Sequence, residues 1–168
     1  IEFCDYAMHG EKEVKEQLLQ VCIQQEAPKK YFSYLQCFLN ESNSDGCLAA
    51  NGITRESLAT CITTVDEKYK VMSGFADKST WKSGRYASFN VFADDVAKYN
   101  VGGSPTFILN GVDVPTRRDS QSLLTTICGA FNTPPAECSQ TLSSDSPSAG
   151  FGYSTTDAAS AAAQCNPV

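Results

Sequence analysis

The sequence contains no C-x-x-C pair, although eight of its 168 residues are cysteines. Redox dithiols and zinc ribbons both use cysteines that are separated by two residues, so residues 1–168 encode neither. The chain has a single histidine, His9. Its spacing from the cysteines does not match that of a Cys/His metal site. We therefore expect no metal and no cofactor.

The sequence also lacks long apolar runs and an excess of basic residues. No stretch approaches the roughly 18 apolar residues of a membrane helix, so no membrane span is expected. Lys and Arg number 13 against 19 Asp and Glu, and the net charge of −6 argues against a nucleic-acid partner, which would require a basic stripe. At this length the chain is expected to form one globular domain with a core, or one domain and a tail.

The eight cysteines favour structural disulfides formed in an oxidising compartment. We therefore predict an extracytoplasmic location: secreted, periplasmic or in the lumen of the secretory pathway. The first residue is Ile1 rather than Met, and no signal-peptide pattern precedes the first apolar residues. We interpret this start as a processed terminus or a fragment.

The most informative stretch is YNVGGSPTFILNGVDV, residues 99–114. An apolar run, residues 106–109, is followed by Asn110-Gly111, which is the strongest short signal for a β-hairpin. Pro105 stands at the mouth of the first strand, where a missing N–H is tolerated and a cis peptide bond is compatible with a tight turn.

Much of the remaining chain has helical periodicity. Apolar residues recur at three- and four-residue spacing from Glu11 until Pro28 breaks the pattern, and a second helix with an aromatic face follows from about Lys29. Thr54 and Asp119 stand where helix N-caps are expected. Before these helices, the alternation in residues 1–6 predicts a short strand.

The helices suggest three disulfide pairs, although spacing alone does not fix connectivity. Cys47 and Cys61 flank one helix–turn–helix, and Cys22 and Cys37 stand on two successive helices, so both pairs are hypotheses. Cys128 and Cys138 flank a proline break and form the best-supported pair. From Ser139 the composition shifts to small and polar residues, which predicts a disordered tail over 139–168. In that tail Cys165 is free, paired with Cys4 or intermolecular.

The segments GSPTFILNG and ICGAFNTPPAEC closely resemble thioredoxin-fold thiol–disulfide oxidoreductases of the DsbA-like family. The resemblance covers residues 1–138 and implies an α/β thioredoxin-like fold, partial because the first βα unit is missing. A disulfide-bearing helical insertion is expected over about 11–85, with the cis-proline loop, hairpin and final helix over about 99–138.

The resemblance also implies a function. In that family the residue before the cis proline pairs its backbone with an extended substrate, which assigns substrate binding to Ser104, Pro105 and Thr106. His9 is a further candidate, because it follows the first strand. The family's C-x-x-C opens the first helix, so we expect it upstream of residue 1. The expected partners are cysteine-containing polypeptides and a redox partner protein.

Three hypotheses remain open. In the first, the chain carries the substrate-binding half of a thiol–disulfide oxidoreductase. In the second, it is a redox-inactive thioredoxin-like module that binds an extended peptide by strand addition. In the third, it is a secreted helical protein, rich in disulfides and unrelated to thioredoxins, which a trans Pro105 would favour.

Overall fold

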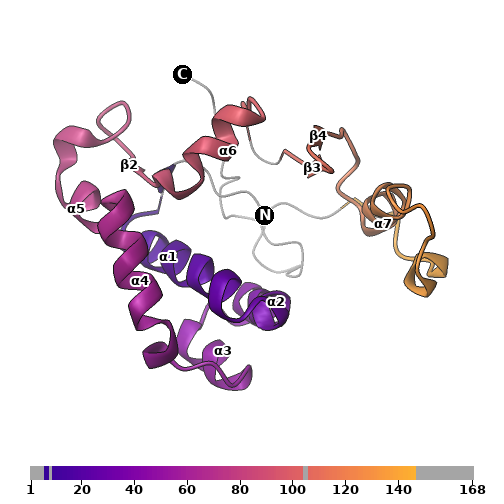
Figure 1. The fold of residues 1–168 in the computed structure, drawn as a ribbon, viewed down its shortest axis with the longest axis horizontal. Coiled ribbons are helices and arrows are strands. Elements are labelled where there is room, and N and C mark those ends of the chain that lie inside the picture. The colour runs from indigo at the N-terminus through magenta and orange to yellow at the C-terminus, as the bar shows by residue number, and fades with distance from the viewer. Residues whose placement is uncertain (1–5, 8, 104–105, 147–168) are drawn as a thin grey trace. The chain divides into compact units, whose positions relative to one another are not determined.

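The structure is a computed structural model, and it describes residues 6–7, 9–103 and 106–146 (Figure 1). Most of the described backbone is helical. The α-helices are α1 (Glu11–Glu26), α2 (Tyr31–Glu41), α3 (Ser44–Ala50), α4 (Arg55–Tyr69), α5 (Val71–Ala76), α6 (Ala93–Lys98) and α7 (Ser120–Cys128). The 3-10 helices are η1 (Pro28–Lys30), η2 (Lys78–Thr80), η3 (Asn90–Phe92) and η4 (Ala136–Ser139). The strands are β1 (Tyr6–Ala7), β2 (Ala87–Ser88), β3 (Ile108–Leu109) and β4 (Val112–Asp113).

The chain divides into two compact units between Asp95 and Val96. In the first unit, α1 packs against α4, and α2 packs against α3 (Figure 1). The helix limits follow from local chemistry. Helix α1 begins after Gly10, which has a φ of 85°, and ends at Glu26, just before Pro28. Helix α4 is capped by Thr54, whose Oγ1 accepts the N–H of Ser57 at 3.2 Å, as predicted.

The first unit has a well-buried core. Its large, fully buried side chains include Val14, Ile23, Tyr34, Leu58, Val71 and Phe89. They come from α1, α2, α4, α5 and the residue after β2. Apolar stripes of neighbouring helices therefore supply the packing, and the two-residue strands contribute little of it.

The predicted thioredoxin-like α/β fold is wrong for this structure. Within the described residues, β1 pairs with β2 and β3 with β4, giving separate two-stranded antiparallel sheets and no central sheet. The strand predicted over residues 1–6 appears only as β1, which begins at Tyr6, and residues 1–5 lie outside the described chain. Strands of two residues bury too little surface to organise a layered α/β core.

Two disulfides staple the helices of the first unit. Cys22 of α1 is bonded to Cys61 of α4, and Cys37 of α2 is bonded to Cys47 of α3. The predicted pairs Cys22–Cys37 and Cys47–Cys61 are therefore wrong. They are wrong because α1 packs against α4, and α2 packs against α3. The predictions for Cys4 and Cys165 fall outside the described residues.

The second unit contains hairpin β3–β4 and helix α7, and the predicted Cys128–Cys138 disulfide is confirmed. None of the described apolar side chains from Val96 to Ser146 is fully buried. The proposed boundary at residue 138 and the disordered tail stay predictions, and of the predicted tail only residues 139–146 are described.

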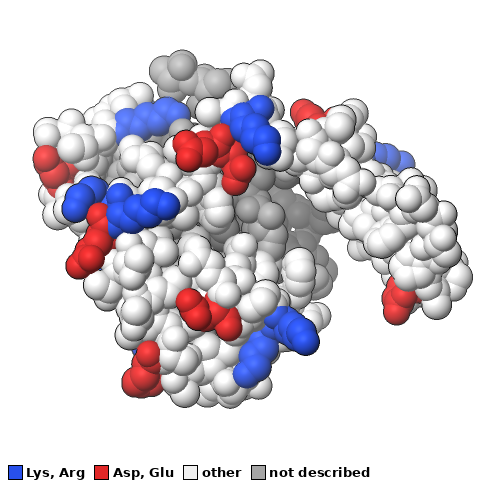
Figure 2. Space-filling model, in the orientation of Figure 1, with Lys and Arg blue, Asp and Glu red and all other residues white. Residues whose placement is uncertain are grey.

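Three features of the described residues bear on the class of protein. No helix among the described residues combines the length and the apolar character needed to cross a bilayer. On the face drawn in Figure 2, basic and acidic side chains are interspersed rather than gathered by sign. The three disulfides are typical of a protein that matures in an oxidising environment.

Candidate functional site

The predicted hairpin is present and forms the centre of the candidate site. Asn110 and Gly111 have φ values of 52° and 83°, which is the left-handed pair that a tight two-residue hairpin turn requires. Leu109 is paired with Val112 across this turn. Two residue pairs further out, the N–H of Val114 donates to the carbonyl of Phe107 at 2.9 Å.

This register determines which backbone groups face outward. Residue pairs in an antiparallel ladder alternate between those that exchange hydrogen bonds and those that do not. Because Phe107 pairs with Val114 through such a bond, the intervening pair Ile108–Asp113 directs its N–H and C=O groups away from the partner strand. The side chain of Val112 is 63% exposed. The hairpin therefore offers a strand edge and an exposed apolar side chain at one place.

Only one of the three predicted substrate residues is described. Ser104 and Pro105 lie outside the described residues, and the predicted cis-proline loop with them. Thr106 is half-buried, and its hydroxyl donates to the carbonyl of Gly103 at 2.7 Å. This bond holds the side chain of Thr106 just before β3, which begins at Ile108.

His9 has a local structural contact. Its backbone N–H donates to Glu13 Oε2 at 2.6 Å, and its imidazole Nδ1 lies 3.4 Å from the same oxygen. The imidazole is 62% exposed. The contact satisfies a backbone donor next to the first turn of α1, and a role for His9 in substrate binding stays a prediction.

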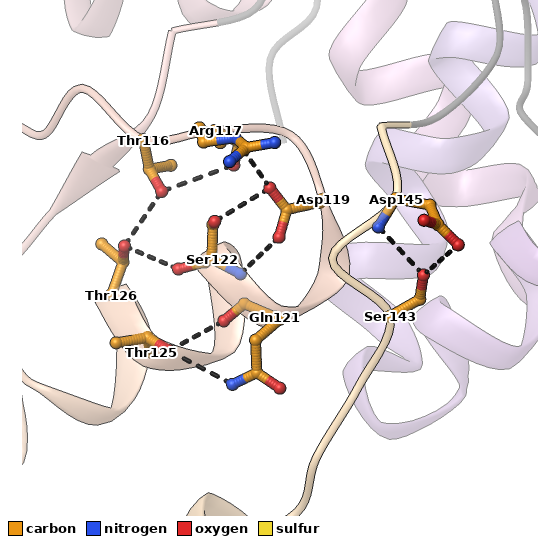
Figure 3. A network of polar contacts seen from close by, with 9 residues as sticks. All are labelled: Thr116, Arg117, Asp119, Gln121, Ser122, Thr125, Thr126, Ser143 and Asp145. Carbon is orange, nitrogen blue, oxygen red and sulfur yellow. Dashed lines mark hydrogen bonds and ion pairs between the residues drawn. The ribbon is translucent and has the colours of Figure 1, made fainter.

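A polar network follows the hairpin and fixes the start of α7 (Figure 3). The carboxylate of Asp119 accepts the N–H of Ser122 at 2.8 Å and its hydroxyl at 2.9 Å, and Arg117 Nε lies 3.3 Å away. Asp119 is 2% exposed. The N–H of Ser122, more than any other group, holds the pKa of Asp119 below its usual value. Asp119 is therefore an ionised helix cap, as predicted.

The network has little catalytic character. The hydroxyl of Ser122 donates to a carboxylate and to no imidazole, so it lacks the base that activates a serine nucleophile. Thr126 shares a 3.0 Å hydrogen bond with Thr116 and donates to the carbonyl of Ser122 at 2.8 Å. These contacts tie the segment after β4 to α7 and so hold the hairpin's exit in place.

Gln121 forms hydrogen bonds with the segment that follows α7, and no sequence pattern predicted these bonds. Its backbone N–H donates to the carbonyl of Ser143 at 3.0 Å, and its Oε1 accepts the N–H of Leu142 at 2.7 Å. Ser143 in turn bonds with Asp145 (Figure 3). Together with the Cys128–Cys138 disulfide, these bonds hold residues 139–145 against α7.

Cysteine chemistry is restricted in the described chain. Sulfur and carboxylate atoms of Cys37, Glu41 and Cys47 lie within 4.8 Å of one another. The two sulfurs are bonded to each other, however, so they are not available as metal ligands. None of the described cysteines is free.

The chain was compared with protein-family models, curated proteins and solved structures, and none of them matches it.

Proposed function

We propose that this chain is the polypeptide-binding part of a thiol–disulfide oxidoreductase that acts on protein disulfides outside the cytoplasm. The observation that carries the proposal is the β3–β4 hairpin, which directly follows the Gly-Gly-Ser-Pro segment and directs backbone groups of Ile108 and Asp113 outward. An extended peptide adds to such an edge through main-chain hydrogen bonds. This mode suits an enzyme with many unfolded substrates, because it depends little on their side chains.

The described disulfides are consistent with a chain that binds the substrate and does not itself carry the reactive dithiol. Exchange requires an activated thiolate and a second thiol that resolves the mixed disulfide. The six described cysteines are all paired, and the sequence has no C-x-x-C. In this proposal these cysteines stabilise the helices and α7, and another polypeptide segment supplies the reactive dithiol.

The test is an exchange assay on the full-length natural polypeptide, with insulin as substrate and glutathione as reductant. Asp113→Pro removes the outward N–H of β4, at an edge position where proline is tolerated. Asp113→Asn is the matched control, because it removes the charge and keeps the N–H. We expect Asp113→Pro to lower the rate by raising KM, with Asp113→Asn close to wild type. Absence of exchange by the natural polypeptide would overturn the enzymatic proposal.

A second function is favoured by the pairing of every described cysteine. The chain would then be a redox-inactive module that binds an extended peptide at the same hairpin. Anisotropy of a fluorescein-labelled peptide, measured beside the insulin assay, separates the two functions. Binding that is sensitive to Asp113→Pro, without exchange by the natural polypeptide, selects the binding module.

A further inference from the structure

A cleft of about 330 Å³ opens in the first unit, where α5, η2, β2 and η3 meet. This volume lies at the lower end of small-molecule sites, which span about 300–1,000 Å³. Its lining includes one cation, Lys70, and one anion, Asp77, together with the polar side chains of Ser88 and Asn90. The cleft lies within the first unit, and no residue of the hairpin lines it.

The two charges of the cleft lack charged partners. Neither Lys70 nor Asp77 has an opposite charge within 4.0 Å among the described residues. Asp77 Oδ1 accepts the N–H of Ser79 at 3.0 Å and its hydroxyl at 2.6 Å, whereas Oδ2 accepts no hydrogen bond from the described chain. The Ser79 hydroxyl and N–H hold the pKa of Asp77 below its usual value, so the carboxylate is ionised at neutral pH.

The other polar side chains that line the cleft differ in how many hydrogen bonds they make. The hydroxyl of Thr80 donates to the carbonyls of Gly74 and Asp77, at 3.2 and 2.8 Å. The side chains of Ser88 and Asn90 make no hydrogen bond within the described chain. A ligand would therefore meet an ammonium, a carboxylate oxygen, a hydroxyl and an amide that are accessible and that bond to water rather than to the described chain.

Lys70 occupies a position that usually favours glycine. It lies between α4 and α5 with a φ of 56°, in the left-handed region. The bend is held by bonds from Met72 N to Asp66 Oδ1, 2.7 Å, and from Gly74 N to the carbonyl of Lys70, 2.8 Å. None of these bonds uses the lysine side chain, so the fold does not account for a lysine at this strained position.

We propose that this cleft binds a small zwitterion, a free amino acid or a similar amino carboxylate. Lys70 pairs with the ligand's carboxylate and Asp77 with its ammonium, while Ser88 and Asn90 complete the hydrogen bonding. A neutral sugar fits less well. Sugars stack on open aromatic faces, and the ring of Tyr69 already carries the ammonium of Lys68 at 4.8 Å. An apolar ligand is disfavoured by the charged and hydroxyl-bearing lining.

The test is a ¹H–¹⁵N NMR titration of the whole chain with L-alanine, L-glutamate and L-lysine. Propionate and ethylamine, each carrying one of the two charges, are the matched ligand controls. We expect saturable shifts at the amides of residues 70–90 with at least one amino acid, at dissociation constants near ~1 mM or below. The two single-charge compounds should bind at least about tenfold more weakly, which is the effect of losing about 1.4 kcal/mol.

Two variants guard against effects on folding. Lys70→Gly removes the ammonium and suits the positive φ, so it should fold at least as well as wild type and lose binding. Gly74→Ala places a methyl group 3.9 Å from Thr80 Oγ1 on the cleft wall and should weaken binding in a well-formed helix. Lys29→Gln, an exposed lysine elsewhere, is the control. No saturable shifts up to about 50 mM, or equal affinity in Lys70→Gly and Lys29→Gln, would overturn the proposal.

Discussion

The hydroxyl of Tyr34 donates a hydrogen bond of 2.9 Å to Glu16 Oε1 and thereby joins α2 to α1. The same carboxylate accepts the Ser44 hydroxyl at 2.5 Å and Gln20 Nε2 at 2.8 Å. One acidic group therefore connects the first three helices, and Tyr34 itself is fully buried. Partly buried polar networks of this kind favour one helix arrangement over others.

Tyr34→Phe should lower the free energy of unfolding by about 1.5–3 kcal/mol, because a partly buried hydrogen bond to a carboxylate is lost. Urea unfolding at neutral pH measures the change. Phe32→Leu, at a residue that is 72% exposed, is the control and should have little effect. A Tyr34→Phe variant as stable as wild type would mean that the Glu16 cluster contributes nothing to the fold.

The same tyrosine predicts a pH dependence. Burial, followed by the nearby charge of Glu16, raises the pKa of Tyr34 above its usual 10.0. The folded chain therefore keeps this proton at pH values where the unfolded chain loses it. The stabilisation is complete below about pH 10 and is lost as the pH rises further. Urea midpoints from about pH 8 to about pH 11 should fall less steeply in Tyr34→Phe than in wild type.

The two helical disulfides should differ in their contribution to stability. Cys22–Cys61 spans 39 residues and Cys37–Cys47 spans 10. In the chain-entropy account, their removal costs about 4 and about 3 kcal/mol respectively. Paired Cys→Ser variants, compared by urea unfolding, measure both. Peptide mapping of the unreduced protein checks the connectivity, and recovery of a Cys22–Cys37 peptide would contradict the packing of α1 against α4.

Asp119→Ala should lower the midpoint of thermal unfolding of the segment around α7, because the Ser122 N–H loses its acceptor. Asp119→Asn keeps an acceptor oxygen and is the matched control. Since the pKa of Asp119 is lowered in the fold, its charge stabilises the chain above the unfolded value of 3.8. That contribution is lost as the pH falls through the lower folded value. An acid-unfolding curve that is unchanged in Asp119→Asn would contradict this role.

Gly111→Ala should destabilise the hairpin by about 1–2 kcal/mol, because alanine is strained at a φ of 83°. Gly102→Ala is the matched control, since that glycine does not have a positive φ and a methyl group there meets open space. Hydrogen exchange at Val112 and Val114 reports on the hairpin directly. Equal protection in the two variants would contradict the left-handed turn at Asn110-Gly111.

The sequence was most informative where one residue type decides the local backbone. Asn110-Gly111, the Thr54 and Asp119 caps and Pro28 each act within a few residues of themselves, and the structure agrees with all of them. Contacts between residues far apart in the sequence could not be predicted in this way. A helical apolar stripe shows that Cys22 faces inward, but it does not say whether α2 or α4 lies opposite.

The candidate site was predicted only in part, for a related reason. The hairpin followed from its turn, whereas the expected central sheet followed from resemblance and is not present among the described strands. The hydrogen bonds of Gln121 with Leu142 and Ser143 join segments about twenty residues apart. Glutamine does not mark a particular backbone position in the way that Gly or Pro does. The positive φ of Lys70 could not be predicted from the sequence either, because lysine is not typical of the left-handed region.

The most direct test of the account is whether an extended polypeptide adds to the β3–β4 hairpin. The measurement is amide hydrogen exchange by NMR on the whole chain, with and without a saturating cysteine-containing peptide. Strand addition predicts new protection of the outward N–H of Asp113 or Ile108, whichever edge is used, and loss of that protection in Asp113→Pro if β4 is the edge. A peptide that binds while both amides exchange as in the free protein, or one that does not bind, would contradict the account.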